Sequence, residues 1–245
     1  MMNSAHKQQS ATLVSPPIKI VGHRGAAGIE LENTMPGFIK AKQLGVDAIE
    51  LDVQLTTDNQ FVVYHETFLQ LLLNRFGRTK RYSYAELQQI LLANGQTVPL
   101  LRDVLAATVG IDKIVDIKID THIKELCDVL NDFPTTNFTF VSSKPKALIA
   151  CKKYRPDISA LSERHYLPFS FSGSVYRHKL DGVNMNYRLL NPFTYRLAQR
   201  HSLQIMAYTI NDVGTAERIR RRYPGVWICT NHPDRFISAL RNTDN

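Results

Sequence analysis

A short segment near the N-terminus contains a histidine followed directly by an arginine. In the run VGHRGAAGIELENT, His23 and Arg24 follow a β-branched stretch and precede Gly25 and Gly28. Histidine can exchange protons near neutral pH, and glycines would let the backbone approach a ligand closely. A lone histidine is more often structural, so the case for catalysis depends on the residues that accompany it.

Carboxylates alternate with apolar residues in two later runs. In AIELDV, Glu50 and Asp52 point to one face of a predicted strand, and that face is otherwise apolar. Two like charges there repel each other and lose hydration, which a divalent cation with oxygen ligands would relieve; hard carboxylates favour Mg²⁺ or Ca²⁺ over zinc. In IVDIKI, Asp116 and Lys118 share a strand face, as a third metal ligand and an anion-binding ammonium would. A charged edge strand and a buried ion pair are the structural alternatives.

The order of these motifs resembles the glycerophosphodiester phosphodiesterase family. That family has HRG, ENT, E-x-D, a histidine after a T-x-D-G-type turn, and E-x-K. The matching positions here are His23-Arg24-Gly25, Glu32-Asn33-Thr34, Glu50 with Asp52, Thr57-Asp58-Asn59 followed by His65, and Asp116 with Lys118. Segments 97–105, 207–212 and 229–234 continue the resemblance, which therefore spans most of the chain.

The resemblance implies a role for each matching residue. The acid/base pair would be His23 and His65, the phosphate ligands Arg24 and Lys118, and the ligands of a Mg²⁺ or Ca²⁺ ion Glu50, Asp52 and Asp116. Tyr208 stands where the family has tryptophan in W-T-x-N, so it would line the substrate pocket or fill the barrel. The implied attacking group is the neighbouring hydroxyl of the substrate, giving a cyclic phosphate that water then opens. Which histidine acts first as base stays open.

The implied activity is metal-dependent hydrolysis of glycerophosphodiesters to glycerol 3-phosphate and an alcohol. Asp116 stands where the family usually has Glu, and Asn231 where it usually has Asp. These departures keep two alternatives open. One is a lysophospholipase D acting on larger lipids, with segment 166–176 as an apolar entrance. The other is a non-catalytic phosphate-binding protein with a degenerate metal site. Glu32 is expected to cap a helix or to hold Arg24.

The elements that must position these residues alternate between short β-branched runs and helical stretches. Strands are predicted over 18–22, 48–55, 61–66, 113–119, 138–143, 158–163, 182–186, 205–210 and 226–231, with helices including 34–44 and 84–93. The short link at 57–59 must join antiparallel strands, because a parallel return needs about a dozen residues or more. The remaining eight strands predict a single-domain TIM-like (β/α)8 barrel with a β-hairpin insert after the second barrel strand. Centring the hairpin between Asp58 and Asn59 would set Asp52 opposite His65.

Composition limits the setting of this barrel. The 245 residues are 44% hydrophobic and 21% charged, which suits a barrel domain over 18–245 after a flexible polar tail at 1–17. No run of about 18 apolar residues occurs, so we expect a cytoplasmic protein without a stable membrane anchor. Three cysteines without CxxC spacing predict buried, reduced thiols.

The net charge of +8 favours anionic partners, and we expect a small-molecule substrate rather than nucleic acid. The oligomeric state stays open, and the arginine run at 218–222 is read as a solvated helix face.

Overall fold

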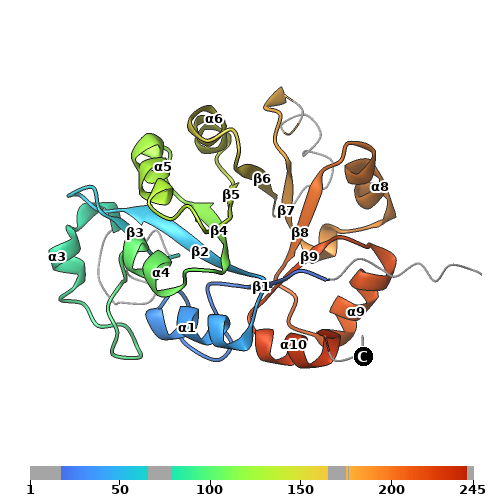
Figure 1. The fold of residues 1–245 in the computed structure, drawn as a ribbon, viewed down its shortest axis with the longest axis horizontal. Coiled ribbons are helices and arrows are strands. Elements are labelled where there is room, and N and C mark those ends of the chain that lie inside the picture. The colour runs from blue at the N-terminus through green and yellow to red at the C-terminus, as the bar shows by residue number, and fades with distance from the viewer. Residues whose placement is uncertain (1–17, 66–78, 165–174, 176, 242–245) are drawn as a thin grey trace, which may run out of the picture.

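Eight parallel strands close into a barrel in the computed structural model, which describes residues 18–65, 79–164, 175 and 177–241 (Figure 1). Closure follows because β1 pairs with both β2 and β9. The barrel strands are β1 (Ile20–Gly22), β2 (Ala48–Leu55), β4 (Asp112–Ile117), β5 (Phe138–Ser142), β6 (Ser159–Arg164), β7 (Gly182–Asn186), β8 (Gln204–Tyr208) and β9 (Trp227–Thr230). The predicted single-domain TIM barrel is confirmed. The predicted tail at 1–17 and nearly all of the segment 166–176 lie outside the described residues.

Helices surround the barrel and connect its strands (Figure 1). Their apolar residues recur every three or four positions, as in α5, where Ile123, Leu126, Cys127 and Leu130 are buried. The outer helices are α1 (Met35–Leu44), α4 (Leu101–Ala107), α5 (Ile123–Asn131), α6 (Pro145–Tyr154), α8 (Pro192–Arg200), α9 (Val213–Arg222) and α10 (Pro233–Arg241). Short turns of 3-10 helix follow at η1 (Thr79–Arg81) and η2 (Tyr187–Leu189).

The ninth strand, β3 (Phe61–Val63), forms the predicted antiparallel hairpin with β2. Its register differs by one residue from the prediction, because Val53 pairs with Val63 and the Tyr64 N–H donates to the Asp52 carbonyl at 3.0 Å. The predicted pairing of Asp52 with His65 is therefore wrong. The loop has three residues, 57–59, with Asn59 in the left-handed region at φ 58°, so the hairpin is centred on a residue rather than on a peptide bond.

The predicted helix over 84–93 is much shorter in the structure. It spans only α3 (Tyr84–Leu87), where Ser83 and Glu86 form a capping box. Beyond it, the Leu92 N–H donates to the Gln96 carbonyl, and Gly95 adopts φ 75°. Directly after α3 the Gln89 N–H donates to the Glu86 carbonyl and the Ile90 N–H to the Leu87 carbonyl, so the α-helical pattern has already ended before this turn.

The inward-facing side chains change from apolar to polar along each barrel strand. An apolar cluster fills the lower interior, formed by Val21, Ala48, Ile114, Val141, Leu161, Met206 and Cys229. Two residues further on, the same inward face of these strands carries polar groups, among them His23, Glu50, Asp116, Ser143, Glu163 and Tyr208. Apolar side chains thus fill the barrel interior below the polar layer. The polar groups gather at the carboxyl ends of the strands, where barrel enzymes hold their active sites.

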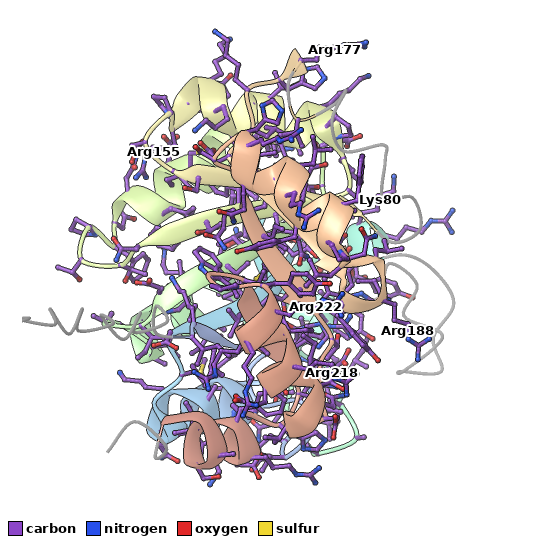
Figure 2. All side chains as sticks on the ribbon, turned by 90° about the vertical axis from the view of Figure 1, so that its right-hand side faces the viewer. Lys80, Arg155, Arg177, Arg188, Arg218 and Arg222 are labelled. Carbon is purple, nitrogen blue, oxygen red and sulfur yellow. The ribbon has the colours of Figure 1, made fainter. Side chains whose placement is uncertain are left out.

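The surface and the thiols agree with the sequence expectations. Arg218, Arg221 and Arg222 are exposed on α9, and Figure 2 shows Arg218 and Arg222 along this helix. The three cysteines are free and buried. Within the described residues, no helix combines the length and the apolar character needed to cross a membrane.

Candidate active site

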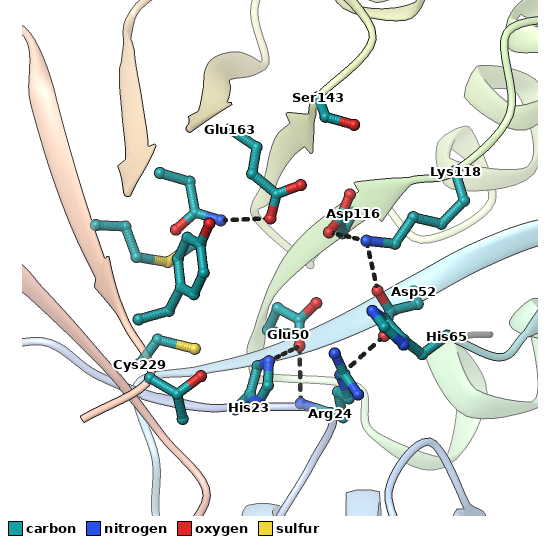
Figure 3. Close-up of a pocket in the computed structure, with 14 residues that line it drawn as sticks. His23, Arg24, Glu50, Asp52, His65, Asp116, Lys118, Ser143, Glu163 and Cys229 are labelled. Carbon is teal, nitrogen blue, oxygen red and sulfur yellow. Dashed lines mark hydrogen bonds and ion pairs between the residues drawn. The ribbon is translucent and has the colours of Figure 1, made fainter. Parts of the chain in front are cut away.

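A cavity of about 240 Å³ opens at the carboxyl ends of the barrel strands (Figure 3). All eight residues that the sequence singled out line it, although they come from five different strands and their following loops. They are His23, Arg24, Glu50, Asp52, His65, Asp116, Lys118 and Tyr208. The wall is completed by Ser143, Glu163, Asn184, Met206, Thr209 and Cys229.

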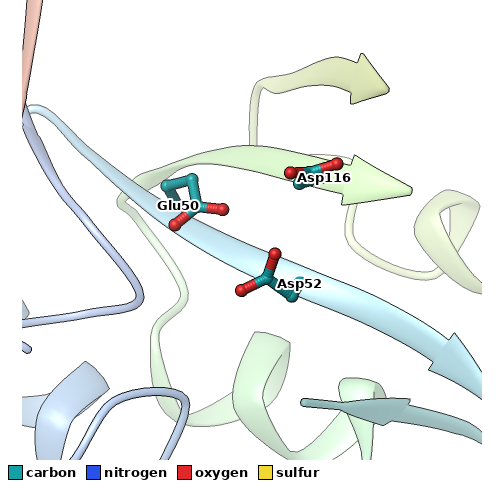
Figure 4. Close-up of side chains that lie close together, drawn as sticks. All are labelled: Glu50, Asp52 and Asp116. Atoms are coloured by element: carbon teal, nitrogen blue, oxygen red, sulfur yellow. The ribbon is translucent and has the colours of Figure 1, made fainter. Parts of the chain in front are cut away.

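Three buried carboxylates form a compact group on two neighbouring strands (Figure 4). Glu50 and Asp52 lie on β2, and Asp116 on β4 is the direct register partner of Asp52. Each residue offers one oxygen, and these three oxygens lie within 4.8 Å of one another. The side chains are at most 6% exposed, so water screens their repulsion poorly.

Asp52 is the member of this triad that neighbouring cations stabilise. Its Oδ1 lies 3.0 Å from the Lys118 ammonium, and its Oδ2 accepts a hydrogen bond from Asn33 Nδ2 at 2.8 Å. Arg24 Nε is 3.3 Å from the same Oδ2. Burial disfavours the charged form of Asp52, but Lys118 and Arg24 outweigh it and hold the pKa of this carboxyl at about 2.

The other two carboxylates lack sufficient compensating charge. Burial, together with the charges of Asp52 and Asp116, raises the pKa of Glu50 well above its usual range. Burial raises the pKa of Asp116 to about 8, although Lys118 opposes this shift. Asp116 Oδ1 is buried without a hydrogen-bond partner among the described residues. Without a further cation, Asp116 would therefore hold a proton at neutral pH, and Glu50 is shifted in the same direction.

This donor set fits a hard divalent cation. Carboxylate oxygens are the ligands that Mg²⁺ and Ca²⁺ prefer, and a bound cation would favour the charged form of each acid. Two oxygens on opposite sides of an ion are separated by twice the bond length, which is about 4.2 Å for Mg²⁺ and about 4.8 Å for Ca²⁺. Since the three oxygens lie within 4.8 Å of one another, they are compatible with both ions after small side-chain adjustments.

His23 is held in one orientation by two contacts. Its backbone N–H donates to the Thr230 carbonyl at 2.9 Å, and its Nδ1 lies 2.6 Å from Asn231 Oδ1. Because an amide oxygen only accepts, Nδ1 carries the proton and Nε2 keeps a free lone pair. Burial and the adjacent Arg24 charge lower the pKa of His23 to about 4. The imidazole is thus neutral at pH 7, with Nε2 on the side of Glu50, 4.0 Å from its Oε2.

His65 enters the cavity from the hairpin. It follows β3 and is partly exposed, and Gln54 Nε2 donates to its carbonyl at 3.1 Å. Figure 3 shows its ring beside Asp52. The hairpin insert therefore brings a second imidazole to the triad although its register differs from the prediction.

Glu32 holds Arg24, which is one of its two predicted structural roles. Arg24 Nη1 donates to both Glu32 carboxylate oxygens at 2.8 Å, while the Arg24 backbone N–H donates to Glu50 Oε2 at 2.8 Å. The cap position of α1 is Thr34, which makes no side-chain cap hydrogen bond. Arg24 is therefore fixed between the ENT segment and the triad.

The glycines of this loop approach protein atoms rather than open space for a ligand. Gly25 adopts φ 86°, and a Cβ there would lie 2.7 Å from the Gly37 carbonyl carbon. A Cβ on Gly28 would lie 2.3 Å from the His232 ring. Because glycine has no side chain, the loop can pack against these neighbouring atoms and so place His23 and Arg24 at the cavity.

Tyr208 lines the cavity, which is one of its two predicted placements, and burial raises the pKa of its phenol well above the usual range. The sequence reasoning missed Glu163 and Asn184, which are buried in the cavity wall at 7% and 5% exposure. Both lie two residues beyond an inward-facing position near the foot of their strands, Leu161 and Gly182. Strand periodicity could have found them, but no motif marked these positions.

Comparisons with known proteins agree with this geometry. The model of the "Glycerophosphoryl diester phosphodiesterase family" matches residues 23–235. A glycerophosphodiester phosphodiesterase of Caldanaerobacter subterraneus subsp. tengcongensis is 32% identical, with 91% of this chain and 97% of that protein covered. The human lysophospholipase D GDPD1 is 29% identical over 58% of this chain and 51% of its own length. Among solved structures, an Oleispira antarctica phosphodiesterase in complex with the product sn-glycerol-3-phosphate has a TM-score of 0.84 and 22% identity, covering 95% of this chain and 100% of that one.

Proposed function

This chain belongs to the glycerophosphoryl diester phosphodiesterase family, and we propose that it hydrolyses glycerophosphodiesters to glycerol 3-phosphate and an alcohol. The observation that carries the proposal is that one cavity gathers two histidines, two permanent cations and a carboxylate triad. Phosphodiester cleavage needs a base, an acid and positive charge around the non-bridging oxygens. The residues of this cavity can supply all three.

We assign the first proton transfer to His23, because its ring is neutral and its Nε2 keeps the lone pair. His23 takes the proton of the glycerol hydroxyl next to the phosphoester, and that oxygen forms a bond to phosphorus. His65 gives a proton to the departing alcohol oxygen as its bond to phosphorus breaks. In the second step the two histidines exchange roles, and water opens the cyclic phosphate to glycerol 3-phosphate.

The remaining residues of the cavity bind and orient the substrate. Arg24 and Lys118 contact the phosphate oxygens, and Tyr208 forms part of the wall around the glycerol moiety. Glu50, Asp52 and Asp116 hold Mg²⁺ or Ca²⁺. When bound, the cation supplies positive charge to the non-bridging oxygens.

The test is a substrate panel with the purified full chain. Glycerophosphocholine, glycerophosphoethanolamine and lysophosphatidylcholine are each incubated with Mg²⁺, Ca²⁺ or chelator, and the released phosphomonoester is identified. We expect glycerol 3-phosphate from the first two substrates, and no release with chelator. Lysophosphatidic acid as the main product would favour the lysophospholipase D alternative. Phosphate binding without turnover would favour the non-catalytic alternative.

A further inference from the structure

Two buried polar residues in the cavity have no part in the mechanism proposed above. Glu163 on β6 and Asn184 on β7 are direct register partners on neighbouring parallel strands. Both line the cavity, and Glu163 points into it (Figure 3). Glu163 does not belong to the compact carboxylate group of β2 and β4. The pair therefore forms a separate polar wall of the same cavity.

Asn184 presents a hydrogen-bond acceptor that the protein does not use. Its Nδ2 donates to Glu163 Oε1 at 3.4 Å, and because a carboxylate cannot donate in return, this contact fixes the direction of the amide. Asn184 Oδ1 is then buried with no hydrogen-bond partner in the part of the chain that the structure describes. Buried polar atoms are nearly always paired, so this oxygen pairs with a donor that enters the cavity, which is water in the free protein and a ligand group when one is bound.

The chemistry of the pair selects the kind of ligand group. A phosphate is excluded here, since its oxygens would face the Glu163 carboxylate and an amide oxygen. A trimethylammonium group has no proton to donate to Asn184, and a primary ammonium can donate to Asn184 Oδ1 but cannot accept from its N–H. A hydroxyl group fits, because it can donate to an acceptor oxygen and accept from an amide N–H. This small buried wall also suits the glycerol moiety, which all glycerophosphodiesters share, better than the leaving alcohol, which differs among them.

We propose that Glu163 and Asn184 bind the terminal hydroxyl of the glycerol moiety and so make the enzyme select substrates whose glycerol carries no acyl chain there. This proposal rests on the function proposed above. In a lysophospholipid with its acyl chain on this oxygen, the hydroxyl is an ester that can only accept, and it leaves Asn184 Oδ1 unpaired. Sites built around a buried hydroxyl contact reject analogues that lack it far more strongly than apolar pockets reject a methylene.

The direct test measures binding of the product and its deoxy analogue, so it does not depend on turnover. In calorimetric titrations, propane-1,2-diol phosphate, which lacks only the terminal hydroxyl, is expected to bind roughly tenfold or more weakly than sn-glycerol 3-phosphate. Asn184→Leu and Glu163→Gln should bring the two affinities together, mainly by weakening binding of glycerol 3-phosphate. Ser143→Ala, at an exposed position on the rim of the same cavity, should keep the wild-type preference.

Hydrolysis then separates this proposal from the proposed function. The wild-type protein should cleave glycerophosphocholine roughly 100-fold or more faster, in kcat/KM, than either its terminal deoxy analogue or 1-acyl lysophosphatidylcholine. Equal product affinities in the wild-type protein would overturn the subsite, whether or not hydrolysis occurs. A binding preference that Asn184→Leu abolishes, in a protein that cleaves none of the diesters, would support the subsite and refute the proposed function. If Asn184→Leu and Glu163→Gln lose hydrolysis of only one glycerophosphodiester and keep that of the other, the pair contacts the leaving alcohol, and the proposal is overturned.

Discussion

At the level of single residues, the contact between His23 and Asn231 fixes which imidazole nitrogen can take a proton. Asn231 orients the ring without adding charge, whereas the family's usual aspartate would stabilise the protonated imidazole. We predict that Asn231→Asp raises the pKa of His23 from about 4 toward neutrality. The acid limb of the kcat/KM profile should then move to higher pH, because the base is neutral only above its pKa. An acid limb that stays in place in Asn231→Asp would exclude His23 as the group responsible for it.

Asp116 is the second residue at which a side-chain change has a predictable effect. Its carboxylate reaches roughly 1.5 Å less far than the family's usual glutamate would from the same backbone position. We expect a water molecule to complete the metal contact on this side, since Mg²⁺ commonly keeps several waters. Asp116→Glu should then lower the metal concentration for half-maximal hydrolysis by about tenfold, or 1.4 kcal/mol. An unchanged or higher requirement would mean that Asp116 already ligates directly or does not face the metal.

At the level of elements, the loop after β1 depends on a glycine that packs against α1. Alanine at Gly25 would combine an unfavourable φ of 86° with a contact of 2.7 Å to the backbone of Gly37. Gly110 has the same φ and no neighbouring atom within 4 Å, so it is a matched control for the conformational cost alone. We predict that Gly110→Ala costs about 1 kcal/mol and Gly25→Ala about 1–3 kcal/mol more, with reduced activity only in the latter. Urea unfolding measures both, and equal losses would show that the packing contact is unimportant.

The elements also show what periodicity and turn chemistry could predict. The eight barrel strands were found because β-branched runs of five to eight residues alternate with helical stretches, and the motif residues lie on these strands or shortly after them. The hairpin register was missed by one residue because its loop length depends on the left-handed conformation of Asn59, which its residue type permits but does not require. Glu163 and Asn184 were missed because their strands carry no recognisable motif, and only the order and register of strands β4 to β8 bring them to the same cavity as Asp116 and Tyr208.

At the level of the whole molecule, the proposed metal site would couple cation binding to folding stability. Asp116, with a pKa of about 8, and Glu50 both bind protons more tightly in the folded protein than in the unfolded chain. Between pH 6.5 and 8 the unfolded chain has already released its carboxyl protons while the metal-free folded protein still holds the proton of Asp116, so the unfolding free energy falls as pH rises. His23 has the opposite effect, but only below its ordinary pKa of 6.5, outside this window.

We therefore predict that the melting temperature of chelator-treated protein falls between pH 6.5 and 8. A saturating divalent cation should raise it more at pH 8 than at pH 6.5, because the ligands are then already deprotonated. Asp116→Asn should remove much of the pH dependence. A melting temperature that responds neither to pH nor to Mg²⁺ or Ca²⁺ would contradict the coupling.

The central claim is that His23 and His65 transfer the protons of glycerophosphodiester hydrolysis. It is tested most directly by glycerol 3-phosphate release from glycerophosphocholine, measured with Mg²⁺ or Ca²⁺ for the wild-type chain, His23→Ala, His65→Ala and the double variant. Each single variant should lose about 10²–10⁴ in kcat with its thermal unfolding preserved, and the double variant should lose much less than the product of the two. Single variants that keep more than about a tenth of wild-type turnover would contradict the claim.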